Sequence, residues 1–159
     1  MADIFALLPV VFLLIVAIPL AITDIRQHRL PNAFTYPAIL ISVLGTFTAA
    51  ASSGNWEPFF IGTAINIALT AAALLASLRN GLGMGDVKLL IAMNQSLAYF
   101  SPWLVLFSLL IAAITATVIG LARVTRKTLS WKDRIAFGPF LILGYVVSSG
   151  SAVIGTAIY

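Results

Sequence analysis

The chain has 159 residues, of which 61% are hydrophobic and 9% are charged, and its mean hydropathy is +1.08. A water-soluble domain of this length would carry roughly 25% charged residues to solvate its surface, so the composition excludes a water-soluble protein. The net charge of +4 does not indicate nucleic acid as a partner, because the basic residues lie between apolar runs rather than in one contiguous basic segment.

The chain contains no cysteine and a single histidine. The first fact excludes disulfides, iron–sulfur clusters and thiol nucleophiles, and the second excludes the two-histidine zinc-binding helix of metalloproteases. The glycines before Asp86 fit neither the dinucleotide-binding pattern nor the P-loop pattern. We therefore expect neither a metal nor a cofactor.

Three apolar runs occupy the first half of the chain. The first, residues 4–23, has no cationic stretch before it and no small-residue cleavage site after it, so we expect a retained helix rather than a secretory signal. A polar stretch that ends in Pro31 and Asn32 separates it from the second run, residues 33–52. The third run covers residues 58–78, and each of the three is long enough to cross a bilayer as a helix.

Three further runs occupy the second half. Residues 79–85 form a glycine-rich loop, and residues 86–100, which follow, are the shortest and most polar run. Residues 103–122 and 140–158 have the ordinary length of a membrane span, with a basic loop between them. Because no linker is long enough to divide the chain, the sequence predicts an all-α polytopic membrane protein, with six transmembrane helices in a single domain over residues 1–159.

The distribution of lysine and arginine predicts how the chain is oriented in the cell membrane. With six spans, alternate connections face opposite sides, and cytoplasmic connections carry an excess of basic residues. All nine basic residues lie in or beside the first, third and fifth connections: Arg26, Arg29, Arg79, Lys88, Arg123, Arg126, Lys127, Lys132 and Arg134. We therefore expect these connections to face the cytoplasm and both termini to lie outside.

Two of the five acidic residues fall at the predicted cytoplasmic boundary of the membrane, Asp24 at the end of the first helix and Asp86 at the start of the fourth. Ionisable groups at this boundary are costly and indicate a function. Two carboxylates that lie close together cannot both ionise easily, so one holds a proton while the other activates a water, as in aspartyl proteases. The sequence does not show whether these two lie close together.

Each aspartate also has a structural alternative. Asp86 follows a glycine at a helix start, where aspartate commonly caps exposed amides, and Asp24 has Arg26 and Arg29 nearby as partners for an ordinary ion pair. The glycines before Asp86 either form a flexible loop or let a peptide approach the carboxylate, because glycine has no Cβ. The alternative function is a small proton- or cation-coupled transporter in which the two aspartates are ion sites.

Three segments together resemble a known family. Asp24 is followed by Pro31-Asn32, and the later segment Gly83-Met84-Gly85-Asp86-Val87-Lys88 contains Gly-x-Gly-Asp. These resemble the two-motif signature of the type IV prepilin peptidases and archaeal preflagellin peptidases, whose second motif is shared with other intramembrane aspartyl proteases. A third segment around Gly138-Pro139 is similar to the one that opens the last helix in this family, although Ala136 stands where the family usually has proline. The resemblance covers nearly the whole chain.

The resemblance implies a GxGD-type intramembrane aspartyl protease that removes the short basic leader of a pilin-like precursor at the cytoplasmic face. It implies that Asp24 and Asp86 are the catalytic pair. It also implies supporting roles for Arg29, Pro31, Asn32, Gly83, Gly85, Lys88, Gly138 and Pro139. Many bacterial members carry an additional cysteine-rich segment and methylate the new terminus. The cysteine-free chain resembles the compact, peptidase-only form associated with Flp or Tad pili, or its archaeal counterpart, so no N-methyltransferase activity is expected.

Overall fold

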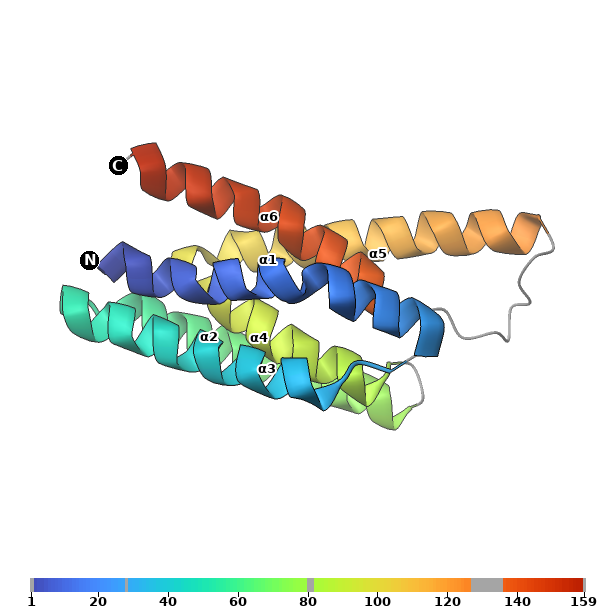
Figure 1. Cartoon of the computed structure of the whole chain (residues 1–159), viewed down its shortest axis with the longest axis horizontal. Helices are drawn as coiled ribbons and strands as arrows, with labels where there is room; N and C mark the ends of the chain where they lie inside the picture. The colour runs from blue at the N-terminus through green and yellow to red at the C-terminus, as the bar shows by residue number, and fades with distance from the viewer. Residues whose placement is uncertain (1, 28, 80–81, 127–135, 159) are drawn as a thin grey trace.

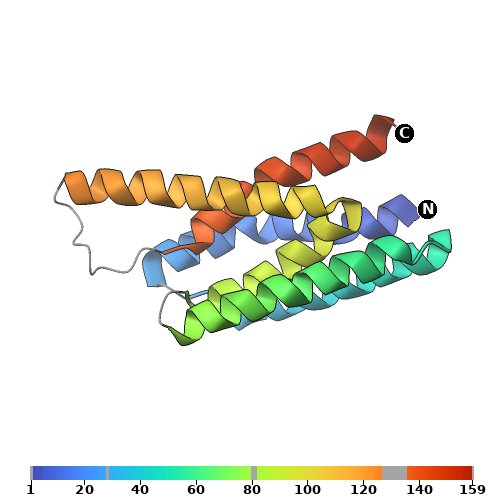
Figure 2. The same cartoon turned by 180° about the vertical axis from the view of Figure 1, so that it is seen from behind.

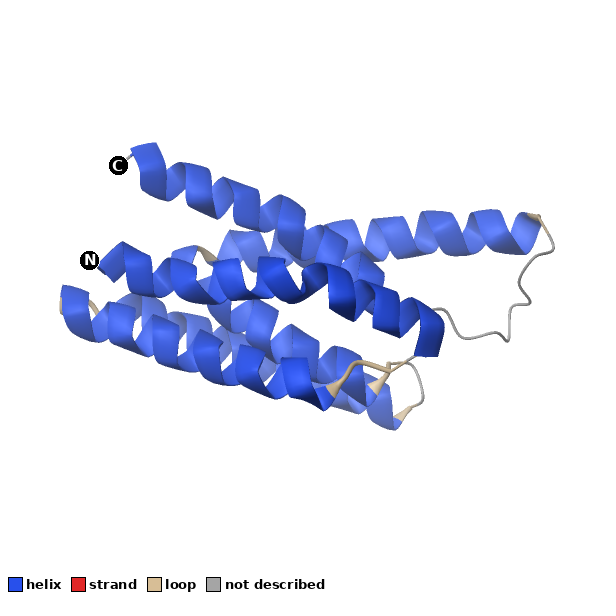
Figure 3. Cartoon of the chain, viewed as in Figure 1, coloured by secondary structure: helices blue, strands red, loops and turns tan. Residues whose placement is uncertain are grey.

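Helices account for nearly all of the chain that the computed structural model describes, which is residues 2–27, 29–79, 82–126 and 136–158 (Figure 1). They are α1 (Ala2–Gln27), α2 (Asn32–Ser53), α3 (Glu57–Leu78), α4 (Met84–Phe100), α5 (Pro102–Thr125) and α6 (Gly138–Ile158). Within these ranges there is no strand (Figure 3). The prediction of an all-α protein is confirmed.

Four of these helices are long and apolar enough to cross a membrane, namely α1, α2, α3 and α5. Helix α6 extends to Ile158, but its backbone and side chains are both described only over Gly138–Ser151, which is shorter than a membrane span. Helix α4 has 17 residues. Each of the six apolar runs in the sequence forms a helix, and over the residues described in full four of these helices have the length and apolarity expected of a membrane span.

Two helix ends differ from the prediction, and both concern the aspartates. Helix α1 continues to Gln27, so Asp24 lies in its last turn rather than at its end. Helix α4 begins at Met84, so Gly85 is helical rather than part of the preceding loop. A helix needs backbone hydrogen bonds and not apolar side chains, so polar residues with adequate helix propensity extend it beyond the apolar run.

Helix α4 lies at the centre of the bundle and packs against each of the other five helices (Figure 2). Most of its side chains are buried, including the polar Asn94, Gln95 and Ser96. A helix surrounded by protein can pair its polar groups with neighbouring helices instead of exposing them to lipid. This position explains why α4 has the least apolar sequence of the six.

Gln95 is the centre of a hydrogen-bond network that joins α4 to α2 and α3. Its amide nitrogen donates to Thr46 Oγ1 at 3.2 Å and to Thr63 Oγ1 at 3.1 Å. Its amide oxygen accepts from Asn66 Nδ2 at 3.1 Å, and the same nitrogen donates to the Ile91 carbonyl at 3.0 Å. Interhelical hydrogen bonds of this kind stabilise helix packing in a membrane. The network fixes α4 against its two neighbours.

Close contacts at two glycines bring the outer helices together. A Cβ at Gly144 of α6 would collide with the Ser108 carbonyl of α5, and a Cβ at Gly45 of α2 would lie 2.7 Å from Pro9 Cγ of α1. Small residues at such positions let helix backbones approach closely, as is common in membrane bundles. Helices α1 and α6 also contact each other and α4. The end of α1 and the starts of α4 and α6 therefore lie near one another.

The helices alternate in direction, so the ends of α1, α3 and α5 and the starts of α2, α4 and α6 lie toward one end of the molecule (Figure 1). The start of α1 and the end of α6 lie toward the opposite end. The first end carries all the described basic residues, which are Arg26, Arg29, Arg79, Lys88, Arg123 and Arg126. Lys127, Lys132, Arg134 and His28 lie outside the described residues.

Candidate active site

The side chain of Asp24 is 5% exposed and is held by the start of α6. Its Oδ2 accepts a hydrogen bond from the backbone N–H of Gly138, the first residue of α6, at 3.0 Å. The first amides of a helix have no partner within the helix, so they are suited to bind a carboxylate. A Cβ at position 138 would lie 2.6 Å from the same oxygen, so a larger residue would displace the carboxylate. Helix α6 thus fixes the orientation of Asp24.

Asp86 lies in the first turn of α4, and its side chain is 8% exposed. Its carboxylate lies beside Gly83, the residue before the helix, which is where the capping alternative places it. A Cβ at position 83 would lie 3.1 Å from Asp86 Oδ2. An ionised carboxylate has about four acceptor positions, so capping leaves positions for a second partner. The structure therefore supports a capping role without restricting Asp86 to it.

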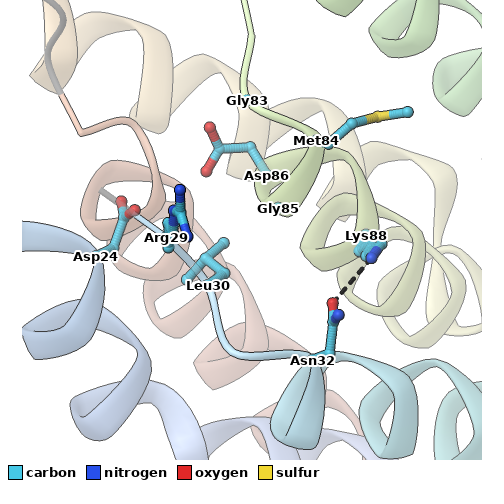
Figure 4. A pocket seen from close by; sticks show the side chains of 9 residues that line it. All are labelled: Asp24, Arg29, Leu30, Asn32, Gly83, Met84, Gly85, Asp86 and Lys88. Atoms are coloured by element: carbon cyan, nitrogen blue, oxygen red, sulfur yellow. Dashed lines mark hydrogen bonds between the residues drawn. The ribbon is translucent and has the colours of Figure 1, made fainter. Parts of the chain in front are cut away.

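Both aspartates line one pocket with a volume of ≈ 270 Å³. In Figure 4, Asp24 extends toward it from α1 and Asp86 from α4. Both side chains are nearly buried, so water and salt screen the charges of the two carboxylates only weakly. The fold thus brings together two acidic groups that are far apart in the sequence. The lining residues are Asp24, Arg29, Leu30, Asn32, Gly83, Met84, Gly85, Asp86 and Lys88.

Most of the predicted supporting residues surround this pocket. Its lining includes Arg29, Asn32, Gly83, Gly85 and Lys88. Gly138 is not in the lining and reaches the pocket only through Asp24. The two prolines are not in the lining either. The Pro31 carbonyl accepts backbone hydrogen bonds from Phe34 and Thr35 and so starts α2, and Pro139 is the second residue of α6. Proline suits these positions because its φ is fixed near the helical value.

The connection between α1 and α2 forms one wall of the pocket and packs against the start of α4. Leu30 in this connection is buried, and a Cβ at Gly85 would lie 3.1 Å from Leu30 Cβ and 3.4 Å from its backbone nitrogen. Glycine at position 85 therefore lets the connection lie directly on α4. No predicted motif includes Leu30. The sequence feature that could have indicated Leu30 is its apolar side chain within an otherwise polar connection.

The side chains of the pocket are suited to proton transfer. They comprise the two carboxylates, the cationic groups of Arg29 and Lys88 and the amide of Asn32. A pair of carboxylates of this kind can take a proton from one reacting group and give one to another. Across residues 2–27, 29–79, 82–126 and 136–158, no three His, Cys, Asp or Glu side chains gather where they could hold a metal ion.

Comparison with known proteins identifies the family. The model of the type IV leader peptidase family matches residues 11–121 of the chain. Two relatives, from Burkholderia pseudomallei strains 1026b and K96243, are each named prepilin leader peptidase/N-methyltransferase and are 29% identical over 143 residues. The match covers 86% of this chain and 43% of each relative, so the chain spans less than half the length of these curated relatives. No solved structure matches the chain.

The matched region contains both aspartates and every residue of the pocket lining, and it ends before α6. With four helices long and apolar enough to cross a membrane, the chain is a multi-pass membrane protein. The family model matches well over half of the chain, and its members are peptidases of type IV leaders. The chain therefore belongs to the type IV leader peptidase family.

Proposed function

We propose that the chain is a GxGD-type intramembrane aspartyl endopeptidase that removes the short basic leader of type IV pilin-like precursors, which are prepilins or preflagellins. The observation that carries this proposal is the pocket shared by Asp24 and Asp86 in a member of a leader peptidase family. The names of the two relatives support prepilins as the substrate class.

The proposal is confined to the peptidase activity. The relatives' names also include an N-methyltransferase, whereas the family whose model matches this chain is named for leader peptidases alone. We infer that it corresponds to the compact, peptidase-only form that its sequence resembles, and that its substrates are precursors of the Flp or Tad type.

In the proposed mechanism the two carboxylates share one proton around a water molecule. The ionised carboxylate takes a proton from the water as the water oxygen attacks the scissile carbonyl carbon, and the protonated carboxyl donates its proton to the carbonyl oxygen. The resulting diol returns a proton to the pair, the leaving nitrogen receives one from it, and the C–N bond breaks. The pair then again holds one proton and is ready for another cycle.

We propose that all six helices span the cell membrane, with the pocket at its cytoplasmic face and both termini outside. The described basic residues lie at the pocket end of the bundle, and cytoplasmic connections are enriched in such residues. Trp56, between α2 and α3 at the opposite end, packs edge-on against Phe47 and Phe59. Aromatic residues gather at membrane interfaces, so this cluster supports an interface there.

Thiol labelling tests this topology. Asn55 and Gln27 are both exposed, and the cysteine-free chain gives no background. We expect Asn55→Cys to react with an impermeant thiol reagent added to intact cells, because the connection between α2 and α3 carries no basic residue. We expect Gln27→Cys to react only after the membrane is permeabilised. Labelling of both positions from the same side would contradict the proposed topology.

A cleavage assay tests the activity. The purified chain in lipid nanodiscs is incubated with a precursor that has a short basic leader before a hydrophobic helix, and the products are identified by mass spectrometry. We expect one cut at the leader boundary, because there the hydrophobic helix can remain in the bilayer while the leader reaches the pocket. Replacing a small residue before the cut with a bulky one should slow cleavage, because bulk would obstruct access to the carboxylates.

A flux measurement distinguishes the transporter alternative. The chain is reconstituted in liposomes, and proton or cation flux is measured for the unaltered chain and for Asp24→Asn and Asp86→Asn. Flux that requires both aspartates, together with no cleavage of any precursor, would contradict the proposed function and support a transporter. Cleavage without flux is the expected result.

A further inference from the structure

Lys88 is held at the start of α2 by two side chains. Its Nζ donates hydrogen bonds to Asn32 Oδ1 at 2.8 Å and to the Tyr36 hydroxyl at 3.1 Å. Figure 4 marks the contact with Asn32. The same nitrogen lies 4.6 Å from the centre of the Tyr36 ring, within the range of a cation–π contact. Asn32 and Tyr36 are one helical turn apart on α2 and so face Lys88 together.

None of these partners carries a negative charge. The ammonium group has three donors, of which one bonds the Asn32 amide oxygen and one the Tyr36 hydroxyl, and both of these groups are neutral. Lys88 also lines the pocket that contains Asp24 and Asp86. Its cation is therefore held in the pocket wall by neutral groups rather than neutralised by them.

These contacts act at the junction of the two pocket walls. Asn32 contacts Lys88, and Leu30, two residues earlier, packs against Gly85. Both contacts join the connection between α1 and α2 to the first turns of α4. A shift of α2 relative to α4 would move the two walls apart and would displace the Lys88 cation.

We propose that Tyr36 is a positioning residue of this pocket. Through its hydroxyl and its ring it holds Lys88, and through Lys88 it keeps the start of α2 against the start of α4. Tyr36 is not part of the pocket lining, so it acts on the site only through Lys88. This inference deepens the proposed function, and its cleavage tests rest on that function.

Two substitutions separate the contributions of the hydroxyl and the ring. Tyr36→Phe keeps the ring, and Tyr36→Leu removes both groups. The Tyr36 side chain is 56% exposed, so neither substitution leaves a cavity in the core. We expect kcat/KM for leader cleavage to fall about threefold for Tyr36→Phe and about tenfold for Tyr36→Leu, the order expected for one charged hydrogen bond and for that bond together with a cation–π contact.

A double-mutant cycle tests whether Tyr36 acts through Lys88. In a Lys88→Met background, we expect Tyr36→Leu to change kcat/KM by less than about twofold, because its partner is already absent. If Tyr36→Leu lowers kcat/KM about tenfold in the Lys88→Met background as well as in the parent chain, the proposal is overturned. The matched control is Leu40→Ala, one turn further along α2, where the side chain is 59% exposed and lies outside the pocket lining. It should leave cleavage unchanged.

A distance measurement tests the proposal independently of cleavage. Spin labels are attached at Ala33→Cys on α2 and Met84→Cys on α4, both exposed positions. Because Met84 lines the pocket, the labelled chain is used for the distance measurement and not for cleavage. We expect a narrow distance distribution in the parent chain and a broader one after Tyr36→Leu. An unchanged distribution would overturn the positioning role. If no precursor is cleaved, the proposed function fails, whereas this measurement still decides the role of Tyr36.

Discussion

Replacing either Asp24 or Asp86 by asparagine should lower the rate of leader cleavage by at least about 10³-fold. Asparagine keeps the shape of the side chain but cannot exchange the catalytic proton, and positioned acid–base groups contribute about 10²–10⁴-fold each. Because the two carboxylates act as one unit, the double variant should be no slower than the slower single variant. Initial rates measured by mass spectrometry with the purified variants check this expectation.

The matched control for this prediction is Glu57→Gln. Glu57 is exposed at the start of α3, at the end of the bundle opposite the pocket, so its substitution should leave the rate unchanged. The Asp24→Asn variant should also keep a normal melting temperature, because its amide oxygen can still accept the Gly138 hydrogen bond. A rate within about tenfold of the parent for either aspartate variant would remove that residue from the proposed catalytic pair.

Replacing Gly138 by alanine should lower kcat by about 10²-fold with little change in KM. The added Cβ would lie 2.6 Å from Asp24 Oδ2 and 3.1 Å from Asp24 Cγ, so the carboxylate has to move. A displacement of about 1 Å in a catalytic group can cost about 10²-fold in rate. KM should change little because Gly138 is not part of the pocket lining. Steady-state cleavage kinetics measure both parameters.

Gly150→Ala provides the comparison within the same helix. A Cβ at Gly150 has no neighbour within 4 Å, and the residue is exposed, so this variant carries the same chemical change without a contact. Both variants should melt at nearly the temperature of the parent chain. Normal cleavage by Gly138→Ala would contradict the view that α6 positions Asp24.

The positions of the helices could be predicted because a backbone in lipid must satisfy its hydrogen bonds internally. A run of apolar residues with polar flanks therefore becomes a helix of nearly the same extent, as residues 33–52 did in α2 (Asn32–Ser53). The helix ends were less predictable. Asp24 lies inside α1 because the polar residues after it extend the helix, and polarity alone does not end a helix.

The neighbours of each helix could not be predicted in the same way. Lipid tails are as apolar as leucine, so a residue that faces lipid and one that faces another helix are of the same kind. The meeting of Asp24 with Asp86 and with Gly138 depends on which faces of α1, α4 and α6 pack together. The family motifs predicted that Asp24, Asp86 and Gly138 belong to one site. The catalytic roles of the two aspartates stay predictions.

Tyr36 shows the limit of motif reasoning. Its one signal was its spacing of one turn from Asn32, and its partner Lys88 lies on another helix far along the chain. An exposed tyrosine on an apolar helix is unremarkable until the packing of α2 on α4 places an ammonium group over its ring. Pairing between distant helices is a property of the fold that a single sequence does not reveal.

The central position of α4 has a consequence for how the protein is made. With 17 residues, an aspartate and a lysine in its first turns and the Gln95 amide in its middle, α4 is a poor substrate for insertion into lipid by itself. The groups that pair with Gln95 belong to α2 and α3, which are synthesised first. We therefore expect α4 to be retained in the bilayer by helices already inserted, so that biogenesis of the chain and assembly of its pocket are one cooperative event.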